Sequence, residues 1–159
     1  MTPTIGLFGT CGASHWRTPF VAEYQRRGIA FFNPQVPNWT PDRADVEAHH
    51  LAHDDIVLFA VTGESSSIGS LAEVGFVVLS VVLAAPRRHV VVHIEPAVGS
   101  SLAARDPSGA EESNRARQLV RAHLRQQATP SARIAESLAE MLDMSLALHS
   151  AYGPHKSCG

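Results

Sequence analysis

The chain has 159 residues, of which 45% are hydrophobic and 18% are charged, which is typical of a globular domain. One compact domain over residues 1–149 is expected, followed by a flexible tail at 150–159. The formal charge of −2 comes from 13 basic and 15 acidic residues, so the chain lacks the basic excess that binds a nucleic acid polymer. Free nucleotides are not excluded as ligands.

The cysteines and the apolar segments indicate a cytoplasmic protein without a membrane partner. Cys11 and Cys158 stand near opposite ends of the chain and form no C-x-x-C pair, so neither a disulfide framework nor a zinc ribbon is predicted. The residues after Met1 lack the pattern of a signal peptide. The most membrane-like segment, Ile68 to Ala85, contains Glu73 and is short for a membrane span, which favours a buried helix.

The first part of the chain alternates apolar runs with helical stretches. The predicted elements are, in order, a strand at 5–9, a helix at 18–27, a strand at 29–32, a helix at 42–53 and a strand at 56–61. Gly28 ends the first helix, and Asp42 stands where it could cap the second.

The alternation continues to the end of the chain. The predicted elements are a helix at 71–83 that is apolar on nearly all sides, a strand at 89–94, a loop at 95–109, an Arg-rich helix at 110–127 and, within 132–149, a short strand or turn before a last helix. Continuous rather than alternating apolar strands indicate a parallel sheet that is covered by helices on both faces. The sequence therefore predicts an α/β three-layer sandwich with about five parallel strands.

Small and polar residues follow the predicted strands. They are Gly9-Thr10, Asn33-Pro34, the stretch from Thr62 to Gly69, and the residues from Glu95 onward. Ligands of open parallel sheets bind outside the carboxyl ends of the strands, so a small-molecule site is expected there.

The segment from Ser67 to Gly75 combines a possible anion site with a carboxylate. Ser67, Gly69 and Ser70 surround the start of the apolar helix, where free backbone N–H groups suit a phosphate. Glu73 follows one turn later within apolar sequence. Desolvation of a carboxylate is costly, so such a residue usually has a partner or a chemical task. Stabilisation of its own helix is the alternative.

These features resemble the nucleoside 2-deoxyribosyltransferases and the related nucleoside 5′-monophosphate N-glycosidases. The matching segments, in the family's order, are Leu7-Phe8-Gly9 with Trp16-Arg17, Phe31-Phe32-Asn33-Pro34 with Trp39, Glu47, Asp55 to Phe59, and Ser67 to Gly75. The resemblance implies a flavodoxin-like (Rossmann-like) subunit, usually in a homo-oligomer of two or more copies. It further implies cleavage of the N-glycosidic bond of a nucleoside or nucleotide and transfer of the sugar to a free nucleobase, without cofactor or metal.

The resemblance assigns the chemistry to two acids. Glu73 matches the nucleophile that attacks the anomeric carbon and holds the sugar covalently, as the carboxylate of a retaining glycosidase does. Asp55 matches an aspartate that helps to protonate the leaving base, although Asp is also common in turns between a helix and a strand. Ser67 stands where the transferases carry an acid and the monophosphate N-glycosidases carry a serine that faces phosphate. Transfer and hydrolysis therefore both remain open.

Other residues of these segments are expected to contact substrate. They are Gly9, Thr10, Trp16, Arg17, Asn33, Pro34, Ser67, Gly69 and Ser70, with Asn114 reaching across a subunit interface. Trp16 and Trp39 offer faces for stacking a base, and Arg17 could meet a carbonyl or a phosphate. A packing role for each tryptophan, and a solvated role for Glu47, are the alternatives.

Two further classes of function have some support in the sequence. His49 and His53 have the i, i+4 spacing of helical metal ligands, but no third ligand is evident, so no metal site is predicted. A nucleotide-binding module without catalysis on the same fold stays open, because a fold does not determine a function.

Overall fold

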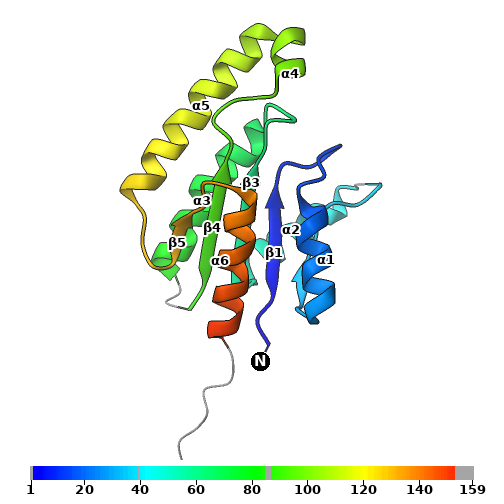
Figure 1. Ribbon diagram of the computed structural model, residues 1–159, viewed down its shortest axis with the longest axis vertical. Helices are drawn as coiled ribbons and strands as arrows, with labels where there is room; N and C mark the ends of the chain where they lie inside the picture. Colours follow the sequence, from blue (N-terminus) through cyan, green and yellow to red (C-terminus); the bar gives the residue numbers. More distant parts are fainter. Residues whose placement is uncertain (1, 39, 85–86, 153–159) are drawn as a thin grey trace, which may run out of the picture.

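The protein is built around one parallel sheet, as the ribbon diagram shows (Figure 1). The computed structural model describes residues 2–38, 40–84 and 87–152. The strands are β1 Ile5–Gly9, β2 Phe31–Phe32, β3 Ile56–Val61, β4 His89–Ile94 and β5 Ala132–Ile134. The helices are α1 Arg17–Arg27, α2 Asp42–His53, α3 Ile68–Ala84, α4 Ser100–Arg105, α5 Pro107–Gln126 and α6 Leu138–Ala151.

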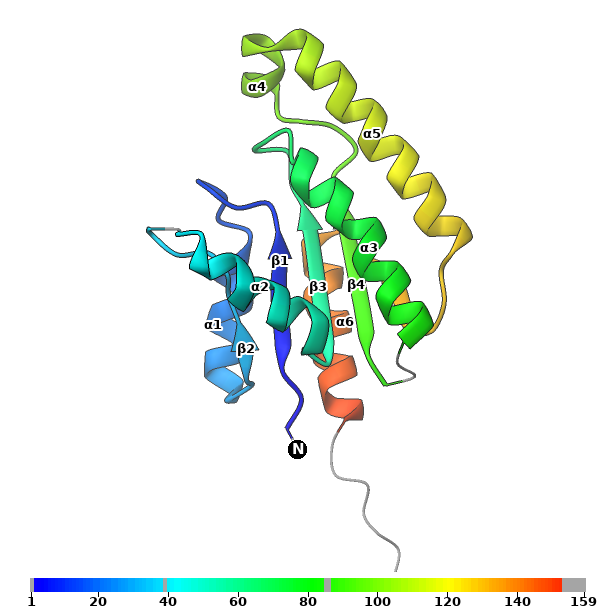
Figure 2. The same ribbon diagram turned by 180° about the vertical axis from the view of Figure 1, so that it is seen from behind.

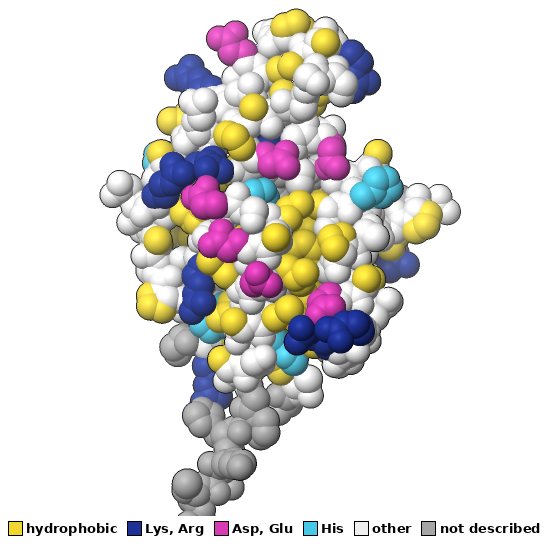
Figure 3. All heavy atoms as spheres, viewed as in Figure 1, with side chains coloured by type: hydrophobic (Ala, Val, Ile, Leu, Met, Phe, Trp, Pro, Cys, Tyr) yellow, Lys and Arg dark blue, Asp and Glu magenta, His cyan; other side chains and the backbone are white. Residues whose placement is uncertain are grey.

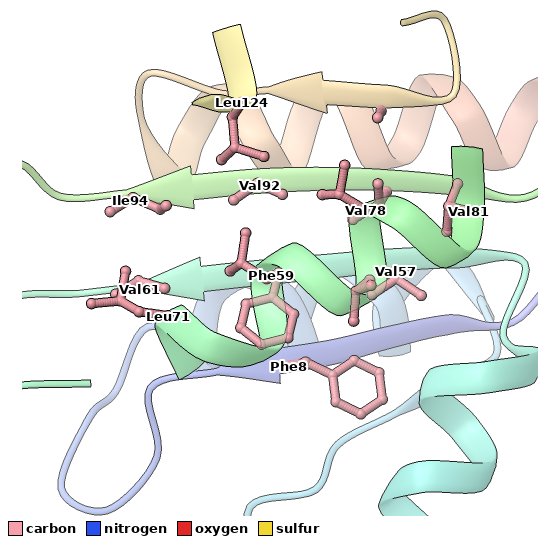
Figure 4. Close-up of a cluster of buried hydrophobic side chains, with 14 residues drawn as sticks. Phe8, Val57, Phe59, Val61, Leu71, Val78, Val81, Val92, Ile94 and Leu124 are labelled. Carbon is pink, nitrogen blue, oxygen red and sulfur yellow. The ribbon is translucent and has the colours of Figure 1, made fainter. Parts of the chain in front are cut away.

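Apolar side chains on both faces of the sheet explain why its strands form. Every residue of β3 is buried, because successive side chains of a strand point to opposite faces and helices cover both. Phe8, Val57, Phe59 and Val92 belong to the core on the side of α3, which Figure 4 shows in close-up. Their neighbours along the strands belong to the core on the other side, with α1 and α6.

The helices form two layers around this sheet. α1 and α6 cover one face (Figure 1), and α2, α3 and α5 lie on the other, as the view from behind shows (Figure 2). All strand pairs are parallel, and the strand order is β2-β1-β3-β4-β5. This is the flavodoxin-like order, and it confirms the predicted three-layer sandwich with five parallel strands.

The strand order places a switch point between β1 and β3. The chain passes from β1 outward to β2 and then returns to the other side of β1, so the loops after β1 and β3 diverge at the same edge. β1 and β3 stay hydrogen-bonded up to their carboxyl ends, where Thr10 N donates to the Ala60 carbonyl at 2.8 Å. Gly9 has a φ of +113°, and a Cβ at this position would clash with the Ala60 backbone.

Several predicted boundaries were wrong. β2 contains only Phe31 and Phe32, and the predicted loop 95–109 holds α4 and the start of α5. The pair Asp106-Pro107 starts α5. Asp106 caps the helix by accepting a hydrogen bond from Gly109 N, and Pro107 occupies the first turn, where its missing N–H costs nothing. Asp42 is not a cap, since Pro41 holds the capping position.

The predicted tail also begins too early. The last helix, α6, extends through residues 150 and 151, which the sequence analysis assigned to the tail. The final seven residues, 153–159, lie outside the described part of the chain.

The apolarity of the helices and the distribution of charged side chains agree with the ordinary globular composition of the chain. Within the described residues, none of the helices has the length and apolarity that crossing a bilayer requires. Figure 3 shows acidic and basic side chains scattered together over the face that carries α1 and α6, with no large patch of a single sign.

Candidate functional site

A cluster of hydroxyl groups lies at the switch point. Thr10, directly after β1, has its Oγ1 2.9 Å from Ser67 Oγ and accepts a hydrogen bond from Thr62 N at 2.9 Å. Ser67 Oγ is also 2.8 Å from Ser65 Oγ. Ser67 is buried, has a positive φ of 54°, and its carbonyl accepts the first hydrogen bond of α3 from Leu71 N. The amino end of α3, with its unpaired N–H groups, therefore meets these hydroxyls.

The buried guanidinium group of Arg17 holds the loop after β1. It donates to the carbonyls of Leu7 at 3.0 Å, Thr10 at 2.6 Å and Gly9 at 3.3 Å, and it lies 4.5 Å from the ring centre of Trp16. Burial lowers the pKa of Arg17. Arg17 therefore positions the loop from beneath rather than contacting a ligand.

Arg117 of α5 holds the loops after β3 and β4 in the same manner. Its side chain is fully buried. Its guanidinium donates to the carbonyls of Val61 at 3.3 Å, Glu95 at 3.2 Å, Thr62 at 3.0 Å and Ser65 at 2.8 Å, and to Ser113 Oγ at 3.1 Å. Burial lowers the pKa of Arg117. In the described part of the chain, neither Arg17 nor Arg117 has a carboxylate at ion-pair distance. Two cations thus lie beneath the loops, satisfied by carbonyl dipoles.

A carboxylate joins the loops after β1 and β3. Glu64 accepts hydrogen bonds from Ser14 Oγ and Thr62 Oγ1. Partial burial alone would raise the pKa of Glu64, but these hydrogen bonds outweigh it and the pKa lies below its ordinary value. Glu64 is therefore an ionised structural link at this edge.

A pocket of about 710 Å³ opens next to the loop that follows Thr10. Its lining comes from the loop after β1, the loop after β2 and helix α2, and consists of Cys11, Gly12, Pro34, Gln35, Val36, Pro37 and Glu47. This volume lies within the usual range of small-molecule sites. The pocket also lies at the sheet edge where ligands of this fold class bind.

Two acidic residues lie on the neighbouring helices α2 and α3. Glu73 is in the second turn of α3, and its side chain is exposed. Partial desolvation raises the pKa of Glu73, and the negative charge of Glu47 raises it further. Glu47 lines the 710 Å³ pocket, so it connects the pocket to Glu73. Both acids lie toward the carboxyl ends of the strands.

The structure does not bring Asp55 to this edge. Asp55 directly precedes β3, where its Oδ2 accepts a hydrogen bond from Thr4 N at 3.0 Å and its carbonyl accepts one from His89 N at 2.8 Å. The length of β3, about 20 Å at ~3.3 Å per residue, separates it from the loops of the site. Asp55 is a turn residue that joins strand starts, which is the alternative weighed from the sequence.

Trp16 and Asn114 also take structural roles within the subunit. Trp16 is 4% exposed, too little for its face to stack on a base, and its Nε1 donates to the Thr10 carbonyl. Asn114 accepts a hydrogen bond from Val98 N at 2.8 Å and so holds the segment after β4. Trp39 lies outside the described residues.

The other expected contact residues lie at the site edge. Asn33 Oδ1 accepts a hydrogen bond from Gln35 N, which forms the turn that presents Gln35 and Pro34 to the pocket. Gly69 is exposed and Ser70 is half-buried in the first turn of α3.

The histidines of α2 contact one another and the backbone of their own helix. The rings of His49 and His53 stack with centres 4.4 Å apart, and His53 Nδ1 lies 2.7 Å from the His49 carbonyl oxygen. Across the described ranges, no group of three or more His, Cys, Asp or Glu residues has the arrangement of a metal site.

Sequence reasoning missed three residues that shape this edge, which are Gln35, Glu64 and Arg117. Arg117 belongs to a helix with several exposed arginines, and spacing alone does not separate it from them. Gln35 and Glu64 lie in loops, where their partners come from distant segments.

Comparison with known proteins adds no relative. No protein-family model matches the chain, and no curated protein is similar enough in sequence to count as a match.

Replacement of Arg117 by Met should destabilise the protein by about 3 kcal/mol, because several buried carbonyl groups lose their donor. Arg115→Met, at an exposed position of the same helix, is the matched control and should stay within about 0.5 kcal/mol of wild type. Urea denaturation followed by circular dichroism measures both. Equal midpoints for wild type and Arg117→Met would contradict the role given to this guanidinium.

Proposed function

We propose that this protein cleaves the N-glycosidic bond of a (deoxy)nucleoside through Glu73 and transfers the sugar to another base. The observation that carries the proposal is a 710 Å³ pocket at the ligand-binding edge of the sheet, with Glu47 in its wall and Glu73 on the neighbouring helix α3. Enzymes that cleave glycosidic bonds generally use a pair of carboxyl groups at the substrate site. The likeness of the segment from Ser67 to Gly75 to the deoxyribosyltransferases supports the same reading.

The chemistry follows from the positions of the two acids. The Glu73 carboxylate attacks C1′ of the sugar, the C1′–N bond breaks, and its electron pair leaves with the base. The departing base takes up a proton from solvent, while the ionised carboxyl group of Glu47, rather than that of Asp55, is the second acid near the reacting centre. A second base then attacks C1′ and loses its proton to solvent, while the bond between C1′ and the Glu73 oxygen breaks and restores the carboxylate. The carboxylate also stabilises the positive charge of the oxocarbenium-like transition state.

Hydrolysis of a nucleoside 5′-monophosphate is the second candidate, and the hydroxyl cluster favours it. Thr10, Ser65 and Ser67 gather at the amino end of α3, above the buried cations of Arg17 and Arg117. Hydroxyl donors, helix N–H groups and nearby positive charge together suit a phosphate. An acid in place of Ser67 would repel it. Water then replaces the acceptor base in the second step.

We further propose that α3 pairs with a second copy of the chain. Ile68, Ala72, Phe76, Leu79 and Leu83 form one exposed stripe along this helix, which lies in front of β3 and β4 in Figure 2. Ile68, Phe76, Leu79 and Leu83 are 71%, 71%, 58% and 75% exposed, which amounts to on the order of 500 Å² of apolar surface. A patch of this size is comparable with the largest apolar patch on a typical monomer, and such patches are often functional.

The shape beside this stripe fits a second copy. An apolar groove of about 210 Å³ runs between α3 and α5, lined by Leu71, Val74, Gly75, Val78, Leu79, Val120, His123, Leu124 and Gln127. The protruding Phe76 stands next to it, so two copies related by a twofold axis can each place this ring against the partner's groove. The stripe supplies most of the ~800 Å² that a standard interface buries on each partner. α3 has no Lys or Arg to contact anionic lipid, which favours protein over a membrane surface.

Glu73 is on the same helix, three residues before Phe76. Pairing along α3 would therefore remove water from the neighbourhood of this carboxylate, which glycosyl transfer requires. The exposed thiol of Cys11, which forms no disulfide, suits the reducing cytoplasm as the location of the reaction.

Base release by the wild type is the first test. Purified protein and Glu73→Gln are incubated with nucleosides and 5′-monophosphates, with and without a free acceptor base, and the bases are separated by chromatography. Wild type should release or exchange base, and Glu73→Gln should lose at least about 100-fold, because an amide is a poor nucleophile. Product that needs an acceptor indicates transfer, and product without one indicates hydrolysis. Ligand binding with no base released would favour the non-catalytic module.

The rate should fall at acidic pH. The active form of Glu73 is ionised, and its pKa lies above the ordinary value, so activity is lost as pH falls through this raised pKa. Glu47→Gln removes a negative charge beside Glu73 and should move the acidic limb of kcat/KM to lower pH, besides slowing the reaction. Glu111→Gln, an exposed acid of α5, is the control. An acidic limb that stays in place in Glu47→Gln would refute the coupling of the two carboxyl groups.

Sedimentation velocity tests the α3 interface. Wild type should sediment as a dimer or larger assembly, and Phe76→Asp should shift it toward monomer, because a charge then lies in an apolar contact. Val46→Asp alters an exposed apolar residue of α2 away from the stripe and should leave the assembly intact. A wild type that stays a 17.1 kDa monomer at 100 µM, about the upper end of weak association, would exclude the interface.

A further inference from the structure

The side-chain amide of Gln35 has a fixed orientation in the wall of the 710 Å³ pocket. Its Nε2 donates to the carbonyl oxygens of Gly12 at 2.7 Å and Ser14 at 3.1 Å. Carbonyl oxygens only accept hydrogen bonds, so the nitrogen end of the amide must face the loop after β1. The backbone N–H of Gln35 donates to Asn33 Oδ1 at 3.0 Å, which holds the residue from its other side.

The oxygen of this amide is left for a ligand. Both donor hydrogens of Nε2 are used, and no donor among the described residues bonds to Oε1. Oε1 is also absent from the buried, unsatisfied side-chain atoms of the described chain, so solvent reaches it. The pocket wall therefore presents an accessible hydrogen-bond acceptor. A half-turn of the Gln35 amide would present Nε2 instead, but it would break both hydrogen bonds to the Gly12 and Ser14 carbonyls.

The rest of the pocket suits a flat ring. Pro34, Val36 and Pro37 supply apolar surface, and the carboxyl group of Glu47 is the polar group from α2. A ring held between these walls would meet Glu47 and Gln35 with its polar edges. Apolar walls with a few placed polar groups are typical of small-molecule sites.

We propose that this pocket binds a nucleobase that carries an amino group at purine C6 or pyrimidine C4, and that Gln35 selects it. The amino N–H donates to Gln35 Oε1, while a ring N–H of the free base donates to the Glu47 carboxylate. A 6-oxo purine or a 4-oxo pyrimidine sets a carbonyl oxygen against Oε1, which is acceptor against acceptor. This assignment rests on the proposed function, in which the base is the leaving group or the acceptor of Glu73 chemistry.

Binding of free bases tests the selection independently of catalysis. Isothermal titration of wild type with adenine, hypoxanthine and N6,N6-dimethyladenine should give about 10-fold tighter binding of adenine than of the other two, since a site built to hydrogen-bond an N–H group rejects analogues that lack it. Gln35→Met keeps the length of the side chain and removes the acceptor, so the preference should fall to within about 2-fold. Gln25→Met, at an exposed position of α1, should keep the wild-type preference.

Three results would overturn the proposal: equal affinities in wild type, an adenine preference that survives in Gln35→Met, or no binding of any base at millimolar concentration. Circular dichroism of Gln35→Met confirms that its fold is intact, and the wild-type series of bases tests the selection even if that variant does not fold. The base-release assay separates the two claims. An adenine preference without base release refutes the glycosidic reaction and leaves the selection by Gln35 standing, whereas release without preference does the reverse.

Discussion

Buried guanidinium groups hold the loops on which the proposed site depends. Where a parallel strand ends, its last carbonyl groups lose their partners in the sheet, and leaving them unpaired in the interior is costly. Arg117 donates to carbonyls that follow β3 and β4, and Arg17 does the same after β1. Each brings a charge into the interior that no carboxylate in the described chain pairs at close range. The geometry of the loops therefore rests on two cations that double as a source of positive potential.

This arrangement divides the site electrostatically. Hydroxyl groups and helix N–H groups lie above the cations, where a negative group such as phosphate is favoured. The carboxyl groups of Glu47 and Glu73 lie to the side, between α2 and α3, where a developing positive charge on a sugar would be stabilised. The proposed nucleotide substrate would have both kinds of charge during cleavage of its glycosidic bond, and the two regions would be complementary to it.

Helix α3 connects the chemistry to the surface. Its inner side, with Val74, Val77 and Val81, packs on the sheet, while Phe76 and Leu83 face outward with most of their surface exposed. Glu73 is the one charged residue among the seventeen of this helix. A helix that is apolar on two sides needs two partners, and the sheet supplies one of them. The proposed second copy would cover the other side and shield the neighbourhood of Glu73 at the same time.

The sheet was predictable because its signal is local. Runs such as Ile56–Val61 are apolar at every position, which only a strand covered on both faces explains, and their alternation with helices implies the three layers. The carboxyl-end location of the site follows from that architecture, and the hydroxyls of Thr10 and Ser67 and the position of Glu73 agree with it. Short elements escaped prediction, since α4 is too short to show a helical period.

The partners of individual side chains depended on contacts between segments far apart in the chain. Trp16 and Arg17 have the residue types of ligand contacts, yet packing against α1 and the β1 loop buries both. Asp55 and Glu47 are both acids near one helix, but the direction of β3 places Asp55 at the far edge of the sheet, whereas α2 carries Glu47 to the pocket. Local sequence sets the periodicity of helices and strands, while the direction of each side chain in space is a property of the packed sheet as a whole.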